Sequence, residues 1–136
     1  MTVPLRLFLL LAGMTAAQAQ VAQAQDVTEG RALYDRYCAA CHGPDGTGEG
    51  PLQRVLDVPP GDLSRLQRGT DGRFPLARVV RRIDGRDPLE AHGGEMPVYA
   101  GIFAGRSVPL GTDRGQTVRG SPRLADLVAY LRSLQN

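Results

Sequence analysis

The stretch Cys38-Ala39-Ala40-Cys41-His42 constrains this chain more than any other feature of its sequence. Two thiols in a C-x-x-C spacing, followed at once by histidine, form the attachment signature of c-type haem. On one turn of helix the two sulfurs face the same way, so each can add to one vinyl group of the porphyrin. The imidazole of His42 is then carried under the ring, where its Nε2 can bind iron. The motif therefore predicts a haem held covalently by Cys38 and Cys41.

A bare C-x-x-C also occurs in thioredoxin-like redox sites and in half of a zinc site. The redox site usually lies near a βαβ pattern, and this sequence has none. The zinc site needs further ligands, and outside the motif the chain offers only His92. A disulfide between the two cysteines is the remaining alternative, because export favours disulfides.

The first 25 residues have the features of a secretory signal peptide. Arg6 gives a positive start, an apolar run covers 7–12, and A-x-A cleavage patterns occur at 17–19 and 22–24. Gly13 breaks the apolar run, which is too short for a membrane span of about 20 residues. We therefore expect a signal peptide over 1–25, one domain over 26–136, and a periplasmic location without a membrane span. An uncleaved membrane anchor is the alternative.

The basic residues of the chain are all arginine, and they balance its acids. Loss of Arg6 with the signal leaves 15 arginines against 14 acidic residues, and there is no lysine. The arginines are scattered along the sequence and form no basic run. The charge pattern therefore argues against nucleic-acid binding and against a polybasic membrane patch.

Apolar residues recur at steps of three and four over 27–41, 76–83 and 124–134, which predicts three helices. Residues typical of helix ends flank them: Asp26 with Glu29, Pro75 with Gly85, and Ser121 with Pro122. On the second helix Arg78, Arg81 and Arg82 are expected on the face opposite the apolar one. A shorter helical turn is predicted at 62–66.

The segments between these helices are rich in turn residues, above all 43–51, 69–74 and 100–120. No run alternates apolar and polar residues long enough to predict a sheet, so we expect an all-α domain. Loops of this length are unusual in a compact domain. A bound haem would supply the core around which they wrap.

Two further spacings extend the pattern beyond the haem motif. Gly30, Tyr34 and Cys38 follow one another at intervals of four, and Leu127 precedes Tyr130 by three. With these residues the chain, from about 26 to 135, resembles the class I cytochromes c, small monohaem proteins of the proteobacterial periplasm. The resemblance implies three main helices and long loops around one haem. It also implies that the N- and C-terminal helices cross, with close backbone approach at Gly30.

In class I cytochromes c a methionine before the last helix is the second iron ligand. The chain has one methionine after the signal, Met96, in a loop that continues with Pro97. The resemblance therefore implies that His42 and Met96 are the axial ligands, a pair that raises the reduction potential. His92, four residues before Met96, is the alternative sixth ligand.

The glycine-rich loop 43–51 resembles the one that follows the motif in bacterial relatives. By that likeness the carbonyl of Pro51, or of a neighbour, accepts a hydrogen bond from His42 Nδ1 and leaves Nε2 for iron. Many relatives place a tryptophan near the haem propionates, but this chain has none. The residues left for this role are Arg54, Arg65, Arg73 and Tyr99. The long stretch 105–120 is predicted to be a mobile surface loop, or alternatively a docking element for a partner.

Taken together, these features predict an electron-transfer protein and not an enzyme. The sequence has no Ser/His/Asp set, no carboxylate pair near a histidine and no spare cysteine. We expect a monomer that carries one electron at a time between redox partners such as a dehydrogenase, an oxidase or a cytochrome complex. The alternatives are a haem subunit of a larger oxidoreductase, or an open-site haem sensor or peroxidase if Met96 does not bind iron.

Overall fold

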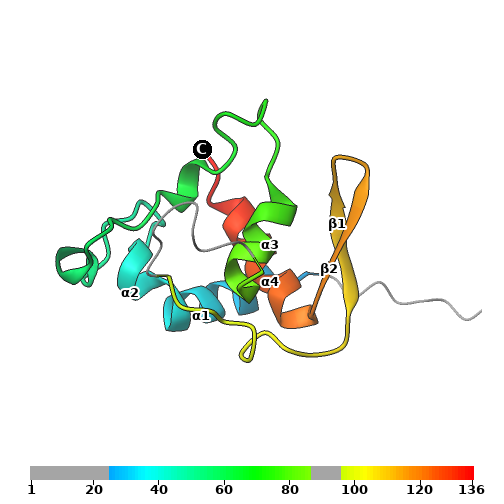
Figure 1. Ribbon diagram of the computed structural model, residues 1–136, viewed down its shortest axis with the longest axis horizontal. Coiled ribbons are helices and arrows are strands. Elements are labelled where there is room, and N and C mark those ends of the chain that lie inside the picture. Colours follow the sequence, from blue (N-terminus) through cyan, green and yellow to red (C-terminus); the bar gives the residue numbers. More distant parts are fainter. Residues whose placement is uncertain (1–24, 87–95) are drawn as a thin grey trace, which may run out of the picture.

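The structure is a computed structural model that describes residues 25–86 and 96–136 (Figure 1). Its α-helices, 3-10 turns and strands are α1 Val27–Tyr37, α2 Ala39–His42, η1 Gln53–Val55, η2 Leu63–Arg65, α3 Leu76–Asp84, β1 Val108–Asp113, β2 Gln116–Gly120 and α4 Pro122–Ser133. No helix within these residues is long and apolar enough to cross a membrane. The predicted signal peptide and His92 lie outside the described residues.

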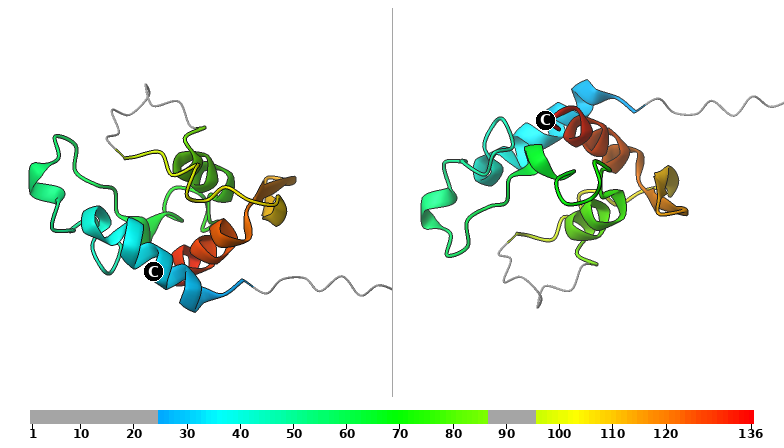
Figure 2. Two further views of the ribbon diagram at one scale, coloured as in Figure 1. Left: turned by 90° about the horizontal axis from the view of Figure 1, so that it is seen from below. Right: turned by 90° about the horizontal axis from the view of Figure 1, so that it is seen from above.

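Helices α1 and α4 lie side by side, as both views in Figure 2 show. Gly30 makes this possible, because a Cβ there would clash with the backbone carbonyl of Asp126 and lie 2.9 Å from the Cβ of Tyr130. The rings of Tyr34 and Tyr130 pack beside this point, with centroids 5.2 Å apart. The close approach predicted at Gly30 is therefore confirmed.

The start of α1 is fixed by Asp26, as predicted. Its carboxylate accepts hydrogen bonds from the backbone N–H groups of Thr28, at 2.8 Å, and Glu29, at 3.2 Å. The backbone N–H of Asp26 donates to the carboxylate of Asp126 in α4, at 2.9 Å. In the predicted capping box the side chain of Glu29 would accept a hydrogen bond from the N–H of Asp26. Here Asp126 of α4 accepts it instead, so the bond joins the two helices.

The ends of α3 and α4 also follow the sequence signals. Gly85 ends α3 in the left-handed conformation, at a φ of 75°, and its N–H donates to the carbonyl of Arg81. Ser121 caps α4 by accepting a hydrogen bond from the N–H of Leu124 at 3.1 Å, and Pro122 occupies the first helical position. The second and third predicted helices are confirmed with these boundaries.

The all-α prediction is wrong for the segment before α4. Strands β1 and β2 form an antiparallel hairpin there, with Val108 opposite Gly120 and Asp113 opposite Gln116. The segment predicted to be a mobile loop is thus a regular element at one edge of the molecule (Figure 1). Leu110 on β1 is buried in the core, which holds the hairpin against the helices.

The sequence conceals this hairpin for two physical reasons. A bulge between Pro109 and Gly111 shifts the register, so the alternation of apolar and polar residues is interrupted. The tight turn is made by Arg114 and Gly115, both at positive φ, at 49° and 80°. Such turns normally carry asparagine or aspartate before the glycine, so an arginine gives no turn signal.

The hairpin also completes the start of α3. Pro75, at the N-cap position, makes no side-chain cap hydrogen bond. The carboxylate of Asp113, at the end of β1, accepts instead from the backbone N–H of Ala77 at 2.8 Å. This negative charge at a helix N-terminus is favourable both as a hydrogen bond and against the helix dipole.

We predict that Asp113→Ala lowers the free energy of unfolding by about 0.5–2 kcal/mol, the usual cost of losing a helix cap. Denaturant unfolding of the purified protein measures this. The control is Gln116→Ala, which removes the exposed residue paired with Asp113 in the hairpin. An equal loss in both variants would mean that the hairpin, and not the cap, is responsible.

Candidate functional site

A cavity of about 660 Å³ lies between α2, the segment that includes η2, helix α3 and the chain from Met96 to Tyr99. Its size falls in the range of small-molecule and cofactor pockets. The sequence singled out four site residues, and all of them line this one cavity: Cys38, Cys41, His42 and Met96. The fold thus brings His42 and Met96, 54 positions apart in the sequence, to the same cavity.

The two cysteines are presented by one helical turn directly after α1. The carbonyl of Cys38 accepts hydrogen bonds from the N–H of Cys41, at 3.1 Å, and of His42, at 2.9 Å. This turn places the side chains of Cys38 and Cys41 on the same face, toward the cavity. The two sulfurs are not joined in a disulfide. Within the described residues, no three His, Cys, Asp or Glu side chains form a cluster that could hold a metal ion by themselves.

His42 is oriented by the backbone carbonyl of Gly61, which lies just before η2. Its Nδ1 lies 3.0 Å from the carbonyl oxygen of Gly61, and since a carbonyl only accepts, Nδ1 carries the proton. The lone pair of Nε2 is then available to a metal. The kind of bond was predicted correctly, but its assignment to Pro51 or a neighbour was wrong. Residues 50 and 52 donate instead to the carbonyls of Cys41 and Ala40, which holds that part of the loop against α2.

Burial sets the protonation of the motif. It raises the pKa of the Cys38 thiol to about 12, and the neighbouring Cys41 adds to this, so the group is uncharged. Burial also lowers the pKa of His42, against the opposing effect of its bond to Gly61, and favours the neutral imidazole. The neutral imidazole is the form of histidine that binds a metal through a ring nitrogen.

Met96 is partly buried and packs against the core. The chain just after it is tied to two helices by Tyr99: its hydroxyl donates to the carbonyl of Tyr37 at 2.8 Å, and its N–H donates to that of Ile83 at 2.9 Å. The rings of Tyr37 and Tyr99 also meet edge to face, with centroids 6.2 Å apart. These contacts hold the Met96 segment near the end of α1, where the haem motif begins.

The glycine-rich loop is shaped by close contacts with the motif. The buried hydroxyl of Tyr34 donates to the carbonyl of Gly43 at 2.6 Å, and Gly43 has a φ of 79°. The N–H of Gly48 donates to the carbonyl of His42 at 2.8 Å. A Cβ at Gly50 would clash with the carbonyls of α2. The loop therefore needs glycine at these positions for its backbone geometry.

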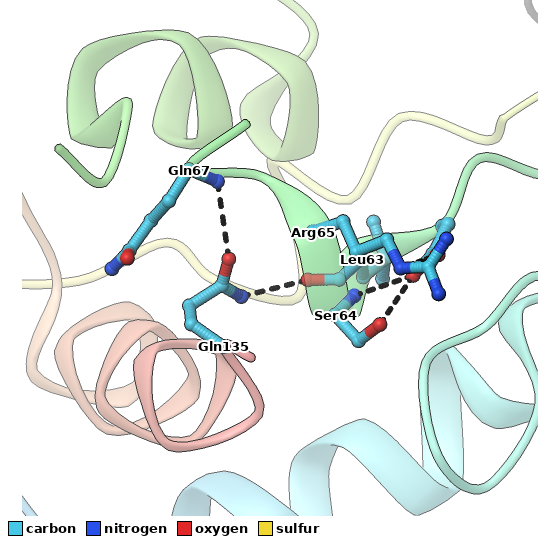
Figure 3. A network of polar contacts seen from close by, with 6 residues as sticks. Leu63, Ser64, Arg65, Gln67 and Gln135 are labelled. Atoms are coloured by element: carbon cyan, nitrogen blue, oxygen red, sulfur yellow. Dashed lines mark hydrogen bonds and ion pairs between the residues drawn. The ribbon is translucent and has the colours of Figure 1, made fainter. Parts of the chain in front are cut away.

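The amide of Gln135 fixes η2 to the end of α4 (Figure 3). Its Nε2 donates to the carbonyls of Leu63 and Leu131, both at 2.7 Å, and its Oε1 accepts from the N–H of Gln67 at 3.2 Å. The segment that forms one side of the cavity is thereby fastened to the core helix.

The residues considered for the propionates divide into two groups. Arg65 and Tyr99 line the cavity. Arg54 lies in a separate surface hollow, and Arg73 pairs with Asp71 at 3.4 Å. Neither is among the residues that line the cavity.

Arg78 and Arg82 also line the cavity. Arg78 and Arg81 are exposed and Arg82 is partly buried, whereas the buried residues of α3 are Leu76, Val79, Val80 and Ile83, so the predicted separation of the two faces is confirmed. The sequence did not predict that Arg78 and Arg82 border the cavity, which Arg81 does not line. Their spacing of four indicates only that these two lie on one side of the helix.

The residues present fit a covalently attached haem. The cavity supplies two thiols on one helical turn, an imidazole with Nε2 free, a thioether and mainly apolar walls. A soft sulfur and an imidazole are ligands that iron accepts in c-type haem proteins.

A family model described as "Cytochrome C oxidase, cbb3-type, subunit III" matches residues 25–99, more than half of the chain. The match includes α1, the motif, α3 and Met96, but ends before the hairpin and α4. No curated protein and no solved structure shows significant similarity to the chain.

We predict that Tyr34→Phe lowers the free energy of unfolding by about 1–3 kcal/mol, because the carbonyl of Gly43 loses its partner in a buried place. Tyr130→Phe is the matched control. Tyr130 packs against Tyr34, yet its hydroxyl makes no hydrogen bond within the described residues. Denaturant unfolding of both variants checks this, and equal losses would show that the bond to Gly43 contributes little.

Proposed function

The chain belongs to the cytochrome c oxidase, cbb3-type, subunit III family of c-type cytochrome domains, and on this basis we propose a one-electron carrier with a single covalent haem c. In this proposal Cys38 and Cys41 form the two thioether bonds. His42, through Nε2, and Met96, through its thioether sulfur, would bind the iron. When bound, the haem iron supplies a ferrous–ferric couple.

One observation carries the proposal: the four residues line one cavity, and the bond from His42 to Gly61 leaves Nε2 free to bind iron. The mainly apolar walls of the cavity would favour the less charged, ferrous state. The thioether of Met96 acts in the same direction, since it is a soft donor. If His42 and Met96 both bind the iron, a substrate would have no open position on the metal, which supports a role in electron transfer.

The proposed setting is the periplasm, since c-type attachment in bacteria takes place outside the cytoplasm. Residues 1–25 would direct export and be removed. The mature domain, with its near balance of charges, is then expected as a monomer that exchanges electrons with redox partner proteins.

The family's description favours a second candidate function, a haem subunit that relays electrons inside a larger complex such as an oxidase. A purified haem-loaded protein that stays monomeric and soluble would argue against this candidate. Stable co-purification with oxidase subunits would support it. An open-site sensor or peroxidase is a third candidate, which the Met96 experiment below addresses.

We predict a mature protein whose mass equals the cleaved polypeptide plus one haem, with haem that survives acid–acetone extraction. Cys38→Ala and Cys41→Ala should each leave one thioether bond and a less stable holoprotein, which mass spectrometry and unfolding would measure. Haem that extracts freely from the unmutated protein would contradict covalent attachment.

We predict that Met96→Ala abolishes the weak far-red band that marks methionine bound to ferric iron. The same change should lower the midpoint potential and let cyanide or carbon monoxide bind quickly, because a soft ligand is lost. Met96→His should keep six-coordinate iron but lower the potential.

His92→Ala is the control for this experiment, and it should leave the band unchanged. A band that persists in Met96→Ala, or disappears in His92→Ala alone, would show that the wrong ligand is assigned.

A further inference from the structure

Four arginines line the cavity, on two of its walls. Arg65 and Arg68 lie at and after η2, and Arg78 and Arg82 lie on α3. Among the residues that the structure describes, the acidic one that lines the same cavity is Asp62. The cavity thus joins mainly apolar walls to a surplus of positive charge, a combination suited to an apolar ligand that carries carboxylates.

One of these arginines, Arg65, is paired with Asp62, and Arg68 lies near the same carboxylate. Arg65 forms an ion pair with it at 3.3 Å. The pKa of Asp62 is lowered first by the hydrogen bond from Ser64, and further by Arg65 and Arg68. The charge of Asp62 is therefore directed at residues in and next to η2, and not at α3.

The pair on α3 has no such balance. In residues 25–86 and 96–136 no hydrogen bond or ion pair involves Arg78 or Arg82. They are four positions apart on one helix, where like charges repel each other. Val79 and Ile83, beside them, complete an α3 face that is half cationic and half apolar toward the cavity.

We propose that Arg78 and Arg82 hold the propionate carboxylates of the haem. The assignment rests on the proposed function, since it concerns the same cavity. A guanidinium is always charged and forks onto a carboxylate with two parallel hydrogen bonds. Binding of carboxylates relieves the repulsion along α3, while Val79 and Ile83 contact the ring. Arg65, which the sequence offered as a propionate ligand, is instead paired with Asp62.

The test is the midpoint potential of the haem-loaded protein as a function of pH. A nearby guanidinium keeps a propionate ionised to low pH, so its loss raises the carboxylate pKa by about one unit or more. In Arg78→Gln and Arg82→Gln the range over which the potential changes with pH should move up by that amount. Within residues 25–86 and 96–136, the other titratable or charged groups that line the cavity are Asp62, Arg65, Arg68, His42, Cys38, Cys41, Tyr37 and Tyr99.

Arg81→Gln is the matched control, because it removes the same charge from the same helix at an exposed position that does not line the cavity. It should leave the pH profile unchanged. Arg78→Lys and Arg82→Lys keep the charge but lose the fork, and are expected to restore the profile in part.

Equal shifts in all three glutamine variants would overturn the assignment. So would unchanged profiles in Arg78→Gln and Arg82→Gln together with an altered salt dependence of electron transfer, which would make the arginines a docking surface for an acidic protein. Both outcomes require covalently bound haem. Its absence from the unmutated protein would instead contradict the proposed function.

Discussion

The contact between α1 and α4 at Gly30 is the constraint on which the rest of the structure depends. It joins parts of the chain 100 residues apart, and the bond from Asp26 to Asp126 lies beside it. Because the haem motif follows α1 directly, this contact fixes where the two cysteines stand relative to the core. Tyr34, on the same helix, then sets the turn after the motif by its bond to Gly43.

Each wall of the cavity is anchored to this pair of helices or to the hairpin. Gln135 fastens the η2 wall to α4, and Tyr99 fastens the Met96 segment to the end of α1. Helix α3 is held at its start by Asp113 of the hairpin. The hairpin lies outside residues 25–99, which match the family model. In this chain an element beyond the matched residues therefore holds the start of α3, one wall of the cavity.

The parts of the fold that could be predicted are those written in local sequence. Asp26, Ser121 and Gly85 mark helix ends because capping depends on neighbouring backbone groups. The partner of His42 and the position of the α3 arginines at the cavity could not be predicted in the same way. Each depends on how distant segments meet, and a carbonyl such as that of Gly61 carries no signature in the sequence. For the same reason the motif cysteines could be identified from the sequence, but not Arg78 and Arg82, which share their cavity.

The order in which the chain is made gives the η2 anchor a further consequence. Gln135 follows Leu63 by 72 residues, and α4 comes well after the cysteine motif. The contacts of Gln135 and of α4 can form only when residues 122–135 are present, so an N-terminal part of the chain cannot complete the η2 wall by itself. The matched residues 25–99 hold all four site residues, but this wall of their cavity is fastened by the end of the chain.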